Sequence, residues 1–142
     1  MEKRREVLSP TAEAVVFLVF NGEKVLVETV FNKDSNFFGY ERFPGGGIKN
    51  NENPEIAARR ELKEELGISE ASLTFLDTFD DTTLDNVFVR LHAFLVTDFD
   101  NLVARERDKS HFEFQTIKET EGSLKLVSAK YMLKIASDHL SR

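Results

Sequence analysis

The pattern of apolar and polar positions predicts a β-hairpin near the start of the chain. Residues 12–20 and 24–30 are two runs rich in β-branched and aromatic side chains. Asn21 and Gly22 lie between these runs and are residue types that favour a tight turn. The next segment, 31–40, mixes aromatic residues with Asn, Asp, Ser and Gly, which predicts a loop. We therefore expect two paired strands followed by a loop.

A short extended segment is expected at 41–43, and Pro44 and the three glycines after it should end that segment. Farther along, residues 55–66 keep apolar positions at helical spacing. Asn53 can cap this helix, Pro54 suits its first position, and Gly67 suits its end. These signals predict a helix with both ends defined.

The second half of the chain predicts three further strands and a terminal helix. The strands are expected at 72–79, 87–96 and 112–117, and the second of these alternates cleanly between two faces. Residues 129–140 have the apolar spacing of an amphipathic helix. The resulting order of elements, β-β-β-α-β-β-β-α, predicts an α/β fold in which helices cover a mixed β-sheet.

Length and composition indicate one domain. The 142 residues contain no internal repeat and no linker-like segment, so we expect a flexible arm at 1–10 and a single domain at 11–142. The chain is 41% apolar and 31% charged, and no apolar run approaches the ~20 residues that span a bilayer. No secretory-type apolar segment follows the charged start. We expect a soluble cytoplasmic protein without a membrane partner.

The charge and the residue types limit the chemistry. Without cysteine the chain has no thiol nucleophile, and its three histidines are scattered, so any metal must be held mainly by oxygen. The formal net charge of -6 repels polyphosphates and nucleic acids at long range. A phosphate substrate would need a bound cation or a local basic patch, and no stable nucleic-acid partner is expected.

The predicted helix carries an acidic face beside its packing face. Projection at ~100° per residue puts Glu61, Glu64 and Glu65 on one arc, next to an apolar stripe. Like charges at these spacings cost about a few tenths of a kcal/mol per pair, which a divalent cation would offset. Oxygen ligands favour Mg²⁺ or Mn²⁺. The alternative is a solvated acidic surface whose charge is balanced by Arg59, Arg60 and Lys63.

The segment before the helix favours the metal site over the solvated acidic surface. The sequence Gly46-x5-Glu52-x7-Arg60-Glu61-Leu62-x-Glu64-Glu65-x-Gly67-Ile68 fills every fixed position of the Nudix box. The chain therefore resembles the MutT-like Nudix hydrolase family. This resemblance implies an α/β/α sandwich with a mixed sheet, and metal-dependent hydrolysis of a phosphoanhydride bond. Its expected substrate is a nucleoside diphosphate linked to another moiety, such as a nucleoside triphosphate or a nucleotide sugar.

The resemblance also implies roles for individual residues. Glu61, Glu64 and Glu65 are the expected metal ligands, with the Gly45 carbonyl and Glu52 as further members of the metal site. Glu61 and Glu64 are catalytic candidates, and Arg60 should orient these glutamates by hydrogen bonds. Relatives differ in their general base, so Glu61 or Glu64 competes with three later glutamates, Glu113, Glu119 and Glu121.

Two features of the segment before the helix affect the conformation of its backbone: the three glycines, and an asparagine where many relatives have glycine. Gly45, Gly46 and Gly47 can adopt conformations closed to other residues and allow main-chain groups to approach a metal or phosphate. Asn51 stands where many relatives carry glycine, but asparagine tolerates the left-handed conformation. We therefore expect the turn to form in this chain.

Several residues outside the helix are candidates for substrate binding. Phe38 and Tyr40, with Phe37, could stack on a base, while Arg42 and Gly46 are placed to reach a phosphate. Anchoring of the loop is the alternative for the aromatics, and a surface charge is the alternative for Arg42. Motifs typical of ADP-ribose and dinucleoside polyphosphate hydrolases are missing, which weakens both assignments.

Two other hypotheses remain at this stage. One is a non-catalytic nucleotide-sensing module on the same fold, because a fold does not guarantee a reaction. The other is an acidic interaction protein without a nucleotide site. Homodimers are common in the family that the chain resembles, so a homodimer is a further possibility that the resemblance implies.

Overall fold

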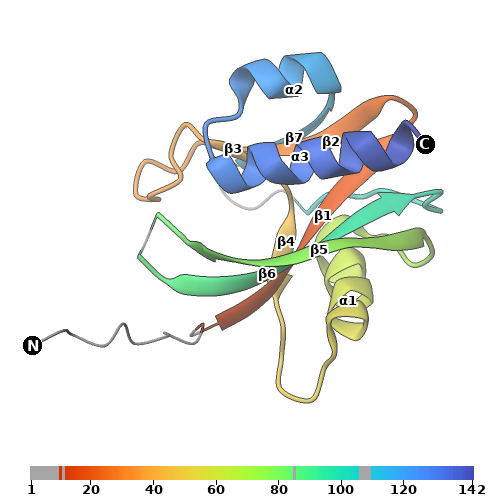
Figure 1. The fold of residues 1–142 in the computed structure, drawn as a ribbon, viewed down its shortest axis with the longest axis horizontal. Coiled ribbons are helices and arrows are strands. Elements are labelled where there is room, and N and C mark those ends of the chain that lie inside the picture. The colour runs from red at the N-terminus through yellow and green to blue at the C-terminus, as the bar shows by residue number, and fades with distance from the viewer. Residues whose placement is uncertain (1–9, 11, 85, 106–109) are drawn as a thin grey trace, which may run out of the picture.

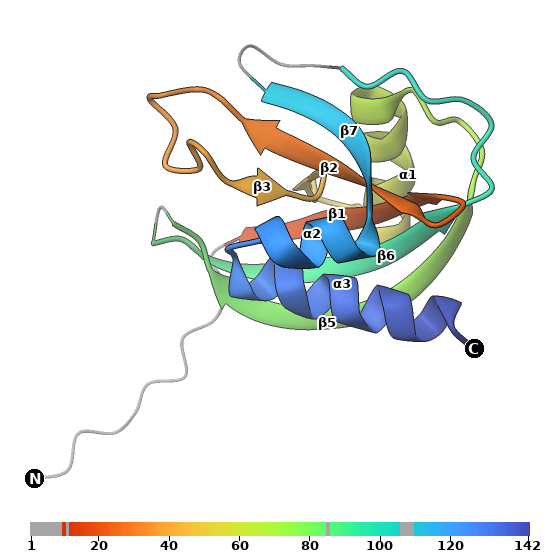
Figure 2. The same cartoon turned by 90° about the horizontal axis from the view of Figure 1, so that it is seen from above.

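A mixed β-sheet lies between one helix on one face and two helices on the other. The computed structural model describes residues 10, 12–84, 86–105 and 110–142. Figures 1 and 2 show α1 on one side of the sheet and α2 with α3 on the other. This arrangement confirms the predicted α/β sandwich. The elements are β1 (Ala12–Asn21), β2 (Lys24–Val30), β3 (Glu41–Arg42), β4 (Gly45–Gly47), α1 (Pro54–Leu66), β5 (Ser72–Thr82), β6 (Phe88–Thr97), β7 (Ser110–Thr116), α2 (Ile117–Ser123) and α3 (Val127–Leu140).

Strand β1 is the centre of the seven-stranded sheet, whose main order is β3-β2-β1-β6-β5. It runs parallel to β6 and antiparallel to β2 and β4, and β7 adds to the other edge of β2. Alternate β1 side chains enter two separate cores. Phe17 packs in the core under α1, whereas Leu18 packs in the core under α3.

Helix α1 has the ends that the sequence predicts. The Asn53 side chain accepts the Ile56 backbone N–H at 2.8 Å, and Pro54 is the first helical residue. Gly67 ends the helix with φ 64°, a left-handed conformation that glycine adopts without steric cost. Ala58, Leu62 and Leu66 are buried against the sheet, so the predicted packing stripe is confirmed.

Two elements differ from the sequence expectation. The short segment ends before Pro44 as expected, as β3, but the three glycines then form a strand of their own, β4, which pairs with β1 at Val15↔Gly46. Ile117 does not end β7 but begins α2, where Thr116 and Glu119 form a reciprocal capping box. Local capping chemistry therefore overrides the apolar pattern at Ile117.

Other boundaries shift by a few residues. Strand β5 continues to Thr82, and α3 begins at Val127, two residues before the predicted start. The expected arm at 1–10 lies, apart from Pro10, outside the described residues. Among the helices of the described part, none is long and apolar enough to cross a membrane.

Candidate functional site

The Glu61 carboxylate lies directly beneath the main chain of Gly46. Glu61 is buried, and a Cβ atom added to Gly46 would lie 2.2 Å from its Cδ atom. A Cβ atom at Gly45 would lie 2.2 Å from the Val15 carbonyl oxygen. None of the three glycines adopts a left-handed φ, so the expectation of special backbone conformations here is wrong. The glycines are needed because strand and carboxylate approach each other closely.

Arg60 binds three glutamates of the Nudix box at once. Its Nε donates to Glu52 Oε2 at 2.6 Å and its Nη2 to Glu52 Oε1 at 2.8 Å. Its Nη1 donates to Glu61 Oε1 at 2.8 Å and to Glu64 Oε2 at 3.1 Å. Nη2 also donates to the Gly47 carbonyl at 3.0 Å. The predicted contacts of Arg60 with glutamates are therefore present, and they connect α1 to β4.

Glu52 closes the loop between β4 and α1. Its carboxylate accepts the two Arg60 bonds and the Lys49 backbone N–H at 2.8 Å. The Arg60 hydrogen bonds, followed by the Lys49 N–H, lower the pKa of Glu52 to about 2. The same pair raises the pKa of Arg60. Asn51 has φ 70°, so the expectation that asparagine supports this turn is confirmed.

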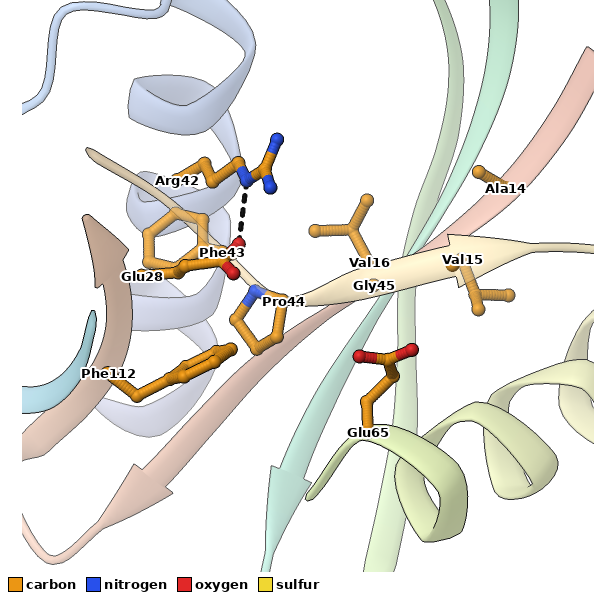
Figure 3. A pocket seen from close by; sticks show the side chains of 11 residues that line it. Ala14, Val15, Val16, Glu28, Arg42, Phe43, Pro44, Gly45, Glu65 and Phe112 are labelled. Atoms are coloured by element: carbon orange, nitrogen blue, oxygen red, sulfur yellow. Dashed lines mark hydrogen bonds and ion pairs between the residues drawn. The ribbon is translucent and has the colours of Figure 1, made fainter. Parts of the chain in front are cut away.

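Glu65 faces a hollow of about 260 Å³ between α1, β4 and β3. Figure 3 shows its carboxylate pointing from α1 toward Gly45, with Glu28 and Arg42 on the opposite side of the hollow. The Glu64 side chain is half exposed and turns toward Arg60. Across the described residues, no three Asp, Glu or His side chains converge closely enough to hold a metal ion directly.

The Gly45 carbonyl faces away from β1. Phe17 donates its N–H to the Pro44 carbonyl, and Ile48 donates its N–H to the Glu13 carbonyl. Hydrogen-bonded and non-hydrogen-bonded residue pairs alternate along antiparallel strands. Gly46 is therefore in a hydrogen-bonded pair with β1, and Gly45 is not. The carbonyl of Gly45 is thus directed to the edge of β4 that does not contact β1.

Sequence reasoning missed Glu28, which lies in the wall of the same hollow. It is buried in β2 and accepts a 2.6 Å hydrogen bond from Arg42 Nε. A lone charged residue within an apolar strand was the available signal. The Arg42 guanidinium also lies over the Phe37 ring, 4.9 Å from its centroid. Arg42 is therefore held in place from two sides.

A second hollow, of about 170 Å³, lies on the other side of Arg42 beneath the start of α3. Its lining is mainly apolar and includes Phe37, but neither Phe38 nor Tyr40. Phe38 is exposed, and the Tyr40 ring faces the Lys125 ammonium at 5.5 Å. Of the predicted aromatic group, the structure thus brings only Phe37 to a hollow.

The three later glutamates lie away from the face of α1. Glu113 hydrogen-bonds Gln115 and pairs in register with Val27, whose side chain enters the core under α3. Glu119 caps α2, and Glu121 is exposed on the same helix. Figure 2 places α2 on the opposite side of the sheet from α1. The structure therefore gives none of these residues a position beside the box glutamates.

Comparison with known proteins identifies the family. The model described as NUDIX domain matches residues 10–133. The chain belongs to the Nudix family. Nudix hydrolases in general use divalent metal ions, which agrees with the oxygen-rich character of this site.

Three relatives show how far the similarity extends. An 8-oxo-dGTP diphosphatase from Proteus vulgaris is 40% identical over 73 residues, which cover 51% of this chain and 64% of that protein. An ADP-ribose pyrophosphatase from Bacillus subtilis (strain 168) is 30% identical over 132 residues, covering 90% of this chain and 68% of that protein. The solution structure of the E. coli ORF135 protein is 26% identical, with TM-score 0.71, over 92% of this chain and 90% of that one. The first match thus spans less than two thirds of its relative.

Proposed function

We propose that this Nudix chain is an active pyrophosphohydrolase that uses Mg²⁺ or Mn²⁺. Its substrate would be a nucleoside diphosphate linked to another moiety, such as a nucleoside triphosphate or a nucleotide sugar. The observation that carries the proposal is the acidic face of α1 against the glycine strand β4, with Glu61 buried beneath Gly46. Two relatives named as a diphosphatase and a pyrophosphatase support the same reaction class.

The residue types fit a hard divalent cation, and the described carboxylates would have to move together to bind one directly. Glu61, Glu64 and Glu65 offer carboxylate oxygens, and Gly45 offers a carbonyl directed away from β1. Mg²⁺ commonly uses a few such ligands together with water and substrate phosphates. Arg60 now occupies the place between Glu61 and Glu64. The Glu64 side chain is 49% exposed, so it would exchange its contact with Arg60 for the ion without leaving a buried position.

Glu52 is better assigned to positioning than to direct metal binding. Its oxygens already accept three hydrogen bonds from Arg60 and Lys49. The bidentate contact fixes the Arg60 guanidinium, which in turn directs Glu61 and Glu64. When bound, the metal would polarise the phosphoryl oxygens and favour attack by water. Glu61 and Glu64 remain the candidates for accepting the proton of that water.

The second hollow suits the organic part of a nucleotide. Arg42 borders both hollows, so a phosphate beside it would connect the acidic hollow to the apolar one. The Phe37 ring lies in the wall and offers a surface for a planar base. This replaces Phe38 and Tyr40 as the stacking candidate, while Arg42 and Gly46 keep their proposed positions near the phosphates.

The test is hydrolysis of nucleoside triphosphates, nucleotide sugars, ADP-ribose and dinucleoside polyphosphates with Mg²⁺. Glu64→Gln should lower kcat by roughly 10²- to 10⁴-fold, the range for loss of an acid–base group. Glu55→Gln, on the same helix but paired with Arg59, is the matched control and should keep activity.

Two results would contradict the proposal. Equal activity of the native chain and Glu64→Gln would remove Glu64 from the catalytic site. If the chain bound nucleotides but hydrolysed none of them in the presence of Mg²⁺, it would instead be a nucleotide-sensing module.

A further inference from the structure

Among the described residues that line the apolar hollow beneath α3, Asp81 is the one charged side chain besides Arg42. We propose that Asp81 selects the base of the substrate by accepting hydrogen bonds from two adjacent N–H groups, as on the edge of guanine. This inference rests on the proposed nucleotide hydrolysis. It assigns base selection to a residue outside the Nudix box.

The position of Asp81 follows from the strand register. Asp81 pairs with Val89 across β5 and β6, and both residues line the hollow. Its neighbour Asp80 points to the other face of the sheet, where it binds Arg90 at 2.8 Å. Figures 1 and 2 show the end of the β5–β6 hairpin beside the start of α3. Asp81 thus faces a cavity enclosed by three parts of the chain.

The Asp81 carboxylate has capacity to bind a ligand. Oδ1 accepts the Thr82 backbone N–H at 2.9 Å, while Oδ2 receives no hydrogen bond from any described residue. The lining includes Leu91, Leu126 and Met132, which offer no donor, and three hydroxyl side chains, none of which donates to Asp81 among the described contacts: Thr82, Thr83 and Ser128. A carboxylate in such a site favours a ligand that supplies N–H groups.

The carboxylate distinguishes the bases because an ionised carboxylate only accepts hydrogen bonds. Guanine presents its ring N1–H and its exocyclic amino group side by side. Adenine and cytosine place a ring nitrogen acceptor beside the amino group, which would repel Asp81. Uracil and thymine present one N–H between two carbonyl oxygens. Guanine is therefore the common base whose edge matches two carboxylate oxygens.

The other end of the hollow fixes the direction of the ligand. Arg42 forms the wall shared with the acidic hollow at Gly45, Gly46 and Glu65. A phosphate chain is attracted to Arg42 and repelled by Asp81. Both charges therefore favour the base toward the β5–β6 hairpin and the phosphates toward α1, the orientation that the reaction needs.

The test compares dGTP with dITP, whose hypoxanthine base keeps the N1–H but lacks the amino group. We expect the native chain to have a kcat/KM for dGTP about 10- to 100-fold above that for dITP. Asp81→Asn should raise the KM for dGTP and bring this ratio close to one, because the amide offers only one acceptor oxygen. That oxygen can still accept the Thr82 N–H, so the hairpin should fold.

Asp80→Asn is the matched control, since it removes the same charge from the neighbouring residue on the opposite face. It should keep the native dGTP/dITP ratio. An unchanged ratio in Asp81→Asn, or equal effects of the two substitutions, would overturn the assignment.

Binding of the product-like dGMP and dIMP, measured by calorimetry, separates this inference from the proposed reaction. Weaker binding of dGMP by Asp81→Asn, in a chain that hydrolyses nothing, would support Asp81 and reject the hydrolase. Turnover of triphosphates without a guanine preference would support the hydrolase and reject the role of Asp81.

Discussion

At the scale of single residues, alanine substitutions at the adjacent Gly46 and Gly47 are expected to have different effects. A methyl group on Gly46 would meet the Glu61 carboxylate, whereas one on Gly47 would meet nothing within 4 Å. Gly46→Ala should therefore displace Glu61, lower the free energy of unfolding by about 1–3 kcal/mol and reduce metal-dependent hydrolysis. Gly47→Ala should leave both nearly unchanged. Urea denaturation and kinetic assays of the two variants check this, and similar losses in both would show that the close approach is unimportant.

The Glu52–Arg60 pair predicts a pH dependence of stability. Glu52 has a folded pKa of about 2, below the ordinary value of 4.5 expected in the unfolded chain. Its contribution should therefore be complete above about pH 4.5 and decline as the pH falls toward 2. Glu52→Gln lacks this ionisation, so the stability difference between native and variant should narrow below pH 4.5. If urea denaturation gave the same difference in the free energy of unfolding between the native chain and Glu52→Gln at pH 7 and at pH 3, this prediction would be wrong.

At the scale of elements, α1 was predictable because its signals are local. The cap at Asn53, the first-turn proline and the terminal glycine are all adjacent in sequence to the residues they affect. The spacing of Glu61, Glu64 and Glu65 likewise required only helical geometry. The metal-binding roles came from the Nudix resemblance rather than from this geometry.

Strand β4 and the positions of Glu28 and Asp81 were not predictable in the same way. Gly45–Gly47 form a strand because Val15 lies opposite, far away in the sequence. Glu28 gains its importance from Arg42, which follows a loop, and Asp81 from the start of α3. Glycine propensity and strand alternation contain no information about these distant partners.

At the scale of the whole molecule, a bound cation would reduce the charge repulsion within a chain of formal net charge -6 and so should stabilise the fold. An ion that binds only the native state stabilises it by mass action. Mg²⁺ at ~100 times its Kd should raise the Tm by roughly 5–10 °C. This shift should be smaller in Glu61→Gln and unchanged in Glu55→Gln, as measured by calorimetry with and without a chelator. Equal shifts in all three proteins would place the bound ion elsewhere.

The central position of β1 also determines when the site can exist. Its parallel partner β6 lies more than half the chain later, and this pairing brings the two halves of the molecule together. Such long-range contacts form slowly, since a large loop must close before they contribute. During synthesis, α1 leaves the ribosome before the strand that completes the sheet beneath it. The sheet beneath α1 is therefore complete only after β6 has paired, and the hollow beneath α3 forms only after α3 has docked.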